Sequence, residues 1–243
     1  MRLGIQVLSA PFIVFSRIAE LINLWGLKED IALCLQVVDA WLSEPVPIKF
    51  IDTLIVAEDR RNALHPGVDP IGMLRAILSC LRNRGIQGAS TIEQQFVRVC
   101  TDSYEMRMQR KFKEQALALA VARRRSKVQI ASAYLSIAYY GYRKKGKSGL
   151  EALCEENLWG CPERKIHESI ARLKYPEPHE PSEIWEQRLT MRTNYIMRRI
   201  QNKKINGKLS LSTFKVIDQI FSSFAKFERK IVNPHIKLAR TES

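Results

Sequence analysis

Apolar residues recur along the chain every three or four positions, which is the spacing of one face of an α-helix. One such helix is expected to begin at Asp69-Pro70, because aspartate caps free backbone N–H groups and proline suits the first helical position. Its apolar face comprises Met73, Leu74, Ile77, Leu78 and Leu81. Gly85 and Gly88 are expected to end it.

The segment 89–140 contains neither glycine nor proline, so it is expected to be helical. Ser126 and Gln129 have the spacing of a capping box, which would start a new helix at Lys127. We therefore predict helices near 91–100, 104–125 and 127–140.

The basic stretch 141–149 contains glycines and is expected to form a mobile loop. Shorter helices interrupted by prolines follow, and then a helix from about Ser182 to Gln201. Strand-like alternation is nowhere convincing, so the predicted fold class is mostly α. Three parts are expected: an N-terminal helical segment over 1–44, a main domain over 45–201, and a basic helical tail over 202–243.

The N-terminal segment has an uncharged stretch from Leu3 to Ser16, which Pro11 interrupts. This stretch is shorter than the roughly 18–20 apolar residues of a membrane-spanning helix. It also lacks the usual cleavage site of a signal peptide. Apolar residues continue at helical spacing as far as Trp25. Two interpretations are equally open: an amphipathic helix on a membrane surface, or a helix packed on the protein core.

The charge of the protein is unusual. Its 39 lysines and arginines exceed 25 acidic residues, which gives a net charge of +14 over 243 residues. Such an excess favours nucleic acid, an anionic membrane surface or a phosphorylated substrate as a partner. The tail over 202–243 has nine basic and three acidic residues. Its apolar stripe favours a helix packed on the main domain, and its charge leaves contact with an anionic surface open.

The five cysteines lack the spacing of zinc ribbons and of thioredoxin-like proteins. We therefore interpret them as small buried apolar side chains. A pairing of Cys154 with Cys161 is open, although nothing in the spacing supports it.

Three polar clusters carry the candidate chemistry. The first is EDRRNALHPGVD over 58–69, and the second is GASTIEQQ over 88–95. Either one alone resembles an ordinary charged turn or a capped helix start. The third cluster places three cations and an acid on one helix face, which suits a diphosphate beside a carboxylate but equally suits a solvated ion pair. Its residues are Arg107, Arg110, Lys111 and Glu114.

In this order and spacing, the clusters resemble the motifs of peptidoglycan glycosyltransferase family 51. This family comprises the transglycosylase domains of penicillin-binding proteins and the monofunctional enzymes. The resemblance extends over about 45–201 and implies a lysozyme-like α-helical glycosyltransferase fold. Its five motifs correspond to 58–69, 88–99, 110–114, 127–136 and, more weakly, 192–199.

The resemblance also implies the chemistry. Family members polymerise lipid II, a disaccharide-pentapeptide on undecaprenyl diphosphate, by inverting transfer at C1 of the donor sugar. Glu58 occupies the position of the general base, and Glu114 that of a second glutamate that assists at the diphosphate or through a divalent ion such as Mg²⁺ or Mn²⁺. Cations for the leaving diphosphate are Arg98, Arg107, Arg110 and Lys111. Ser90, Gln94 and Gln95 match polar contacts to the substrate, and Asp59 and His65 match positions that shape the cleft, with His65 expected to be structural.

Several positions depart from the family pattern. Asn62 stands at an aromatic position, Arg98 replaces lysine, and Glu93 replaces threonine, which would place an extra acid near the diphosphate. Three further motif positions hold Val99, Ser132 and Ser136. The resemblance implies the outer face of a bacterial inner membrane, with lipid II and the membrane surface as partners. The reduced anchor leaves a soluble or cytoplasmic location open.

Other functions remain open from the sequence. One is a catalytically degenerate family member that binds a lipid-linked glycan or a cell-wall partner. Another is a basic helical nucleic-acid-binding protein, although no nucleic-acid motif accompanies the charge, and we do not expect nucleic acid as a partner. A lysozyme-type hydrolase would need similar carboxylates. The basic third cluster argues against a hydrolase, since a neutral glycan has no diphosphate to hold.

Overall fold

Helices dominate the structure, a computed structural model that describes residues 2–82, 88–103, 108–155 and 157–205. The helices of the N-terminal half are α1 (Arg2–Leu21), the 3₁₀ turn η1 (Leu24–Gly26), α2 (Leu27–Ala40), α3 (Ile48–Glu58), α4 (Pro70–Leu81), α5 (Ile92–Cys100) and α6 (Met108–Ala122). The rest comprises α7 (Lys127–Ile137), strands β1 (Tyr139–Gly141) and β2 (Lys144–Lys145), α8 (Gly146–Cys154), α9 (Glu163–Arg172) and α10 (Glu183–Ile205). The predicted mostly α fold is confirmed.

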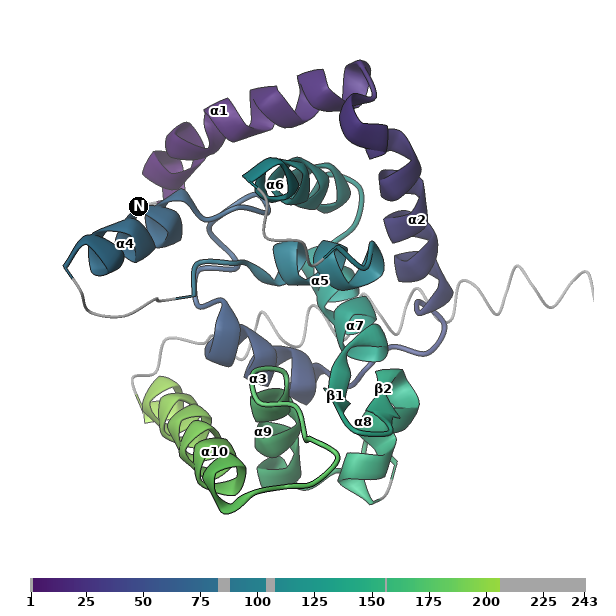
Figure 1. Cartoon of the computed structure of the whole chain (residues 1–243), viewed down its shortest axis with the longest axis vertical. Coiled ribbons are helices and arrows are strands. Elements are labelled where there is room, and N and C mark those ends of the chain that lie inside the picture. The colour runs from purple at the N-terminus through teal and green to yellow at the C-terminus, as the bar shows by residue number, and fades with distance from the viewer. Residues whose placement is uncertain (1, 83–87, 104–107, 156, 206–243) are drawn as a thin grey trace, which may run out of the picture. The chain divides into compact units, whose positions relative to one another are not determined.

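The core is built around α5, α6 and α7. The α6 side chains from Glu114 to Val121 are all buried, as expected for a helix that is covered on every side. Helices α1 and α2 arch over α6, while α3 packs against α9 beyond α7 (Figure 1). The residues Met1–Arg199 form one compact unit and the residues from Ile200 a second. Of the predicted tail, 206–243 lie outside the described residues.

The predicted helix starts are confirmed by their caps. The Asp69 carboxylate accepts the Gly72 N–H at 2.9 Å, with Pro70 in the first position of α4. The Ser126 hydroxyl and the Gln129 amide form the expected capping box of α7. The helix ends differ from the predictions. Helix α6 stops at Ala122, where a turn follows, and α7 stops at Ile137, because Ala138 is extended and leads into β1.

The stretch 141–149 is not a loop, contrary to the prediction. It contains part of the β1–β2 hairpin and the start of α8, and the Gly146 N–H closes the hairpin by donating to the Ala138 carbonyl at 2.8 Å. Gly141 has φ +139°, and a Cβ atom there would lie 2.5 Å from the Glu177 backbone nitrogen. Only glycine at position 141 therefore allows this backbone to pack so closely against that of Glu177. The strands are too short to show alternation in the sequence.

Two cysteines form a disulfide bond, so the interpretation of all five as isolated apolar side chains is wrong. Cys154 at the end of α8 is bonded to Cys161 just before α9. Of the free cysteines, Cys34 is buried and Cys80 is exposed. The Cys34 thiol donates a hydrogen bond to Cys100, which lowers the pKa of Cys100 and, together with burial, raises the pKa of Cys34.

Helix α1 is longer than the uncharged stretch predicted, since it continues through Pro11 and past Arg17. Its segment Gly4–Leu21 is long and apolar enough to cross a membrane. Signal sequences and the core helices of soluble proteins share this length and composition. One face packs on α6, where the Ser16 hydroxyl donates to the Ala116 carbonyl at 2.7 Å. The other face is uncovered and carries Val7, Leu8, Val14, Ile18 and Leu21.

Candidate active site

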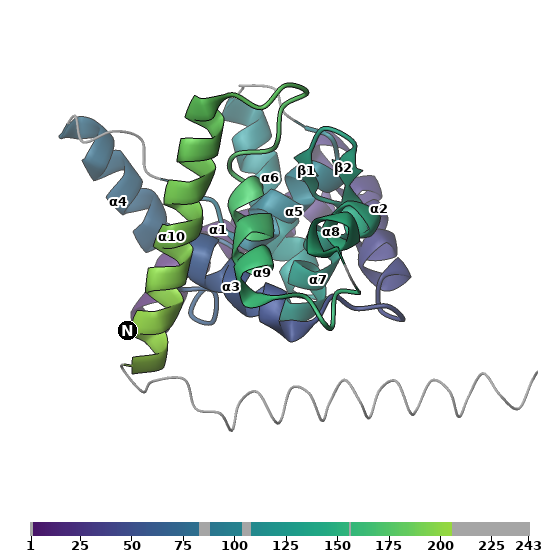
Figure 2. The same ribbon diagram turned by 90° about the horizontal axis from the view of Figure 1, so that it is seen from below.

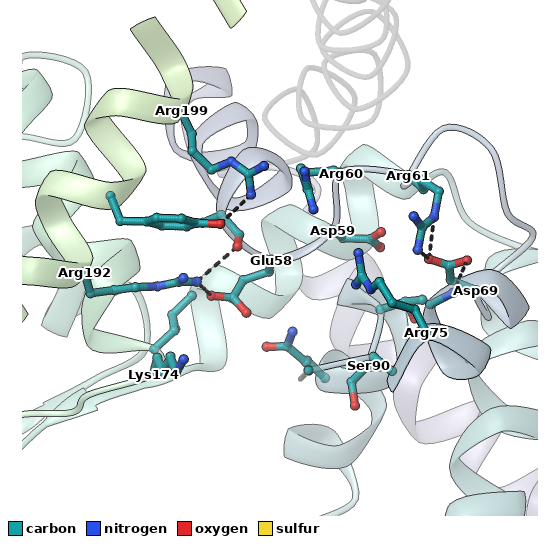
Figure 3. A pocket seen from close by; sticks show the side chains of 18 of the residues that line it. Glu58, Asp59, Arg60, Arg61, Asp69, Arg75, Ser90, Lys174, Arg192 and Arg199 are labelled. Atoms are coloured by element: carbon teal, nitrogen blue, oxygen red, sulfur yellow. Dashed lines mark hydrogen bonds and ion pairs between the residues drawn. The ribbon is translucent and has the colours of Figure 1, made fainter. Parts of the chain in front are cut away.

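A cleft of about 630 Å³ lies where the end of α3 meets the start of α5 and the side of α10 (Figure 3). Seven basic side chains line it: Arg60, Arg61, Arg75, Arg98, Lys174, Arg192 and Arg199. Three acidic side chains also line it: Glu58, Asp59 and Asp69. The excess of positive charge fits an anionic ligand.

Glu58 is the last residue of α3, and its carboxylate faces the cleft. Arg192 of α10 donates from Nη2 to the Glu58 Oε1 at 2.6 Å and to the Ala57 carbonyl at 3.0 Å. Arg192 also lies over the Tyr195 ring, with 5.2 Å from its guanidinium carbon to the ring centroid. The candidate base is therefore held by an arginine far along the chain (Figure 3).

Asp59 follows Glu58 in the chain and lines the cleft with a side chain that is almost fully buried. His65 Nε2 lies 3.0 Å from both Asp59 oxygens, and the Gly67 N–H donates to His65 Nδ1 at 3.2 Å, so Nε2 carries the proton. Burial raises the pKa of Asp59, but the hydrogen bonds from His65 and Asn62 outweigh it, and the net shift is downward. His65 itself is buried and does not line the cleft.

The opposite wall is formed by the start of α5. Ser90 and Gln95, which the family motifs predict to contact the substrate, line the cleft. Gln95 Oε1 accepts a hydrogen bond from the Tyr134 hydroxyl at 2.9 Å. Gln94 is buried instead, because it closes a capping box by accepting the Thr91 N–H at 3.0 Å.

Arg98 extends from α5 into the cleft, and Glu114 of α6 binds its guanidinium group. Its Nε and Nη2 atoms lie 3.0 and 2.8 Å from the two Glu114 oxygens, and Nη2 lies 3.3 Å from the Ser90 hydroxyl. Arg110 donates to the same carboxylate at 2.6 Å. Glu114, Arg110 and Lys111 therefore stand behind Arg98 and do not line the cleft. Arg107 lies outside the described residues.

In this arrangement Glu114 is not suited to bind a divalent metal ion. Its buried carboxylate accepts three guanidinium N–H groups, so both oxygens are already used. The ligand atoms of Asp59, His65 and Glu93 lie within 4.8 Å of one another, as in many metal sites. This group does not fit a metal ion either. His65 Nε2 carries a proton and so has no lone pair for a metal, and the Asp59 carboxylate already accepts several hydrogen bonds.

Glu93 does not extend into the cleft, contrary to the prediction. It is 1% exposed, and its Oε1 accepts the Lys127 ammonium group. The reason is its position in the first turn of α5, where the helix directs it away from the cleft towards α7. The extra acid is therefore absent from the cleft lining.

Sequence reasoning missed several cations of the cleft. Arg192 and Arg199 lie in the weaker fifth motif, and Arg60 lies in the first motif without having been singled out. Burial lowers the pKa of Arg60, and the charges of Arg199 and Arg75 lower it further. Lys174 lies just after α9, and no sequence pattern marked it as a cleft residue. Crowded cations of this kind favour a bound anion.

Comparison with known proteins identifies the family. A model of the transglycosylase family matches residues 36–200, which include every residue that lines the cleft. The chain belongs to the transglycosylase family. The predicted resemblance and the lysozyme-like fold that it implies are thereby confirmed.

The chain is also similar to longer proteins. It is 39% identical over 140 residues to penicillin-binding protein 1A of Vibrio cholerae, which covers 57% of this chain and 16% of that protein. It is 35% identical to penicillin-binding protein 1A of Escherichia coli K12, with the same coverage. It is 32% identical over 169 residues to penicillin-binding protein 1B of Haemophilus influenzae, or 66% of this chain and 21% of that protein. The chain thus matches only a small part of the length of these relatives.

Proposed function

We propose that the protein is a peptidoglycan glycosyltransferase that polymerises lipid II, or a related lipid-diphosphate-linked disaccharide, into glycan strands with release of undecaprenyl diphosphate. The observation that carries this proposal is one cleft that holds a carboxylate, Glu58, opposite a clamped cation, Arg98. Glycosyl transfer from a diphosphate needs both groups, a base for the attacking hydroxyl and positive charge for the leaving group.

Glu58 is the proposed general base. The 4-hydroxyl of the acceptor sugar attacks C1 of the donor sugar, so that an O–C1 bond forms as the bond from C1 to the diphosphate oxygen breaks. The hydroxyl proton moves to the Glu58 carboxylate. Oε1 is held by Arg192, and within the described part of the chain Oε2 accepts no hydrogen bond. Oε2 is therefore the proposed proton acceptor.

Arg98 is the proposed main contact of the leaving diphosphate. Its guanidinium has five N–H donors in a fixed plane. Glu114 holds the Nε and Nη2 atoms, and Nη2 also donates to the Ser90 hydroxyl in the wall of the cleft. Because Arg110 shares Glu114, the cluster keeps a net positive charge. This charge would stabilise the diphosphate as it leaves. In this proposal Arg110 and Lys111 do not contact the diphosphate, and they contribute only through the positive electrostatic potential of their charges.

The remaining cations support a second anionic group in the cleft. Among the described residues, Arg60 and Arg75 make no ion pair, and they enter the cleft on the side of Asp59 (Figure 3). The acceptor is also a lipid diphosphate when two lipid-linked disaccharides are joined. We therefore assign Arg60, Arg75 and Arg199 to the acceptor diphosphate.

A lipid-linked substrate must be taken from a membrane, and an apolar surface supports this step. Helix α1 contacts α4 (Figures 1 and 2). Helix α4 also exposes apolar side chains, those of Leu74, Ile77, Leu78 and Leu81. We propose that these faces of α1 and α4 contact the bilayer, on the outer side of the bacterial inner membrane. The disulfide Cys154–Cys161 supports that side, since structural disulfides persist in oxidising compartments.

Polymerisation of labelled lipid II tests the proposal. The purified protein in detergent is expected to give a ladder of glycan chains on a gel, and Glu58→Gln is expected to abolish the ladder. Glu151→Gln is a matched control, because Glu151 is an exposed residue of α8 outside the cleft lining. Lipid II binding without any ladder from the native protein would overturn the proposal in favour of a binding protein that has lost catalysis.

A further inference from the structure

A buried chain of polar contacts runs behind the cleft from α7 to the residue after Glu58. The Lys127 ammonium donates to Glu93 Oε1, and the Asn62 amide lies 3.5 Å from the same oxygen. The Asn62 amide also donates to Asp59 Oδ2 at 3.2 Å. Asn62 and Asp59 are each 5% exposed, and Glu93 only 1%. The contacts therefore lie in a region of low dielectric, where they are strong and costly to break.

Two of the four residues in this chain of contacts depart from the family pattern. Asn62 stands where the family has an aromatic residue, and Glu93 stands where it has threonine. An aromatic ring at 62 has no amide to donate to Asp59, and a threonine at 93 is too short to reach Lys127. Each departure therefore gives the other a partner. A buried carboxylate such as Glu93 needs a paired cation, and Lys127 supplies it.

Asp59 connects these contacts to both walls of the cleft. It follows Glu58 at the end of α3, and its Oδ2 accepts the Ile92 N–H of α5 at 3.3 Å. Ile92 begins the helix that carries Arg98. The position of the Asp59 carboxylate thus sets how far the base lies from the diphosphate contact. A shift of about 1 Å between reacting groups can cost about 100-fold in rate.

We propose that Asn62, Glu93 and Lys127 are positioning residues, which hold Asp59 and thereby fix the separation of Glu58 from Arg98. The inference rests on the proposed function, since it concerns the geometry of that reaction. None of the three residues lines the cleft, so none is expected to touch the substrate. They act on the rate through Asp59 alone.

The test separates a positioning role from a merely structural one. Glu93→Gln and Lys127→Met are each expected to lower kcat for lipid II polymerisation by about tenfold, with KM changed by less than about twofold. The double variant is expected to be no slower than the slower single variant, because the two residues form one pair. Lys127→Arg keeps the charge and is expected to retain kcat within about threefold.

A matched control is available in a surface ion pair. Lys165 Nζ lies 2.7 Å from Glu155 Oε1. The Glu155 side chain is largely exposed, the Lys165 side chain is partly exposed, and neither lines the cleft. Lys165→Met and Glu155→Gln repeat the same chemical changes and are expected to leave kcat unaltered. Circular dichroism and thermal melting of every variant show which ones are folded.

A second set of variants covers the case in which a single substitution prevents folding. Asn62→Phe and Glu93→Thr restore the family's residue types, and the double variant is expected to be faster than either single variant. Folded Glu93→Gln and Lys127→Met proteins with the kcat of the native protein would overturn the positioning role and leave the proposed function standing. A native protein that makes no glycan would overturn both.

Discussion

Arg192 and Glu58 lie 134 positions apart in the chain and 2.6 Å apart in the structure, with the Arg192 guanidinium held over the Tyr195 ring. Arg192 therefore fixes both the Glu58 carboxylate and the end of α3, since it also binds the Ala57 carbonyl. Helix α10 is thus part of the catalytic unit that we propose.

Removal of Arg192 tests this relationship. Arg192→Met is expected to lower kcat by about 10- to 100-fold, because Glu58 and the Ala57 carbonyl lose their donor together and the base moves. The kcat of Arg192→Lys is expected to lie between those of Arg192→Met and the native protein, since lysine keeps the charge but lacks the planar guanidinium group. Initial rates of lipid II polymerisation measure both. Arg164→Met on the exposed face of α9 is the control, and full activity of Arg192→Met would refute the role.

Arg98 is expected to contribute through the leaving diphosphate. Arg98→Met should lower kcat by about 100- to 1,000-fold, the usual loss when a donor to a developing negative charge is removed. Arg98→Lys restores the charge and the family's usual residue type, so its loss should be much smaller. Arg188→Met, an exposed change on α10 outside the cleft lining, should have no effect. Equal rates for Arg98→Met and Arg98→Lys would exclude a role for the charge.

Local signals in the sequence predicted much of the fold. The caps at Asp69 and Ser126 act within one helical turn, so their residues are visible as short motifs, and the helices that they start were predicted correctly. The disulfide and the β1–β2 hairpin were missed. Both depend on how a turn brings together atoms of neighbouring elements, which composition and periodicity do not report.

The candidate site was predicted in part, by family motifs. These motifs located Glu58, Ser90, Gln95 and Arg98, which line the cleft. They gave the wrong environment for Glu93, because its partner Lys127 comes from another helix. They also did not single out Arg192, whose role depends on how α10 packs beside α3. Interactions between distant elements are set by tertiary packing, and no local pattern encodes them.

The Asp59–His65 pair is expected to make stability depend on acid pH. The folded-state pKa of Asp59 is lowered, whereas an unfolded aspartate titrates near about 3.9. The stabilisation is therefore complete above pH about 4 and is lost as the pH falls through the lowered folded-state pKa. Asp59→Asn should lose about 1–3 kcal/mol of unfolding free energy at pH 7 and show a weaker decrease below pH 4. Urea unfolding at several pH values measures this, and an unchanged acid dependence would contradict the assignment.

The apolar faces of α1 and α4 are expected to bind lipid bilayers. In α4, Leu74 and Ile77 are each 56% exposed and lie one turn apart, so they face the same way. The double variant Leu74→Glu/Ile77→Glu places two charges on this face, and burial of a charge in a bilayer is costly. Co-sedimentation with anionic vesicles should therefore fall by at least about fivefold.

The matched control adds the same two charges elsewhere. Leu33 of α2 and Ile184 of α10 are also exposed, so Leu33→Glu/Ile184→Glu should reduce vesicle binding only by the small electrostatic effect of a lower net charge. Polymerisation in detergent should persist in both double variants, since none of the four residues lines the cleft. An equal fall in sedimentation for the two variants would assign membrane binding to charge alone. A fall confined to the α4 variant would assign membrane binding to the apolar face, as the proposed uptake of a lipid-linked substrate from the bilayer requires.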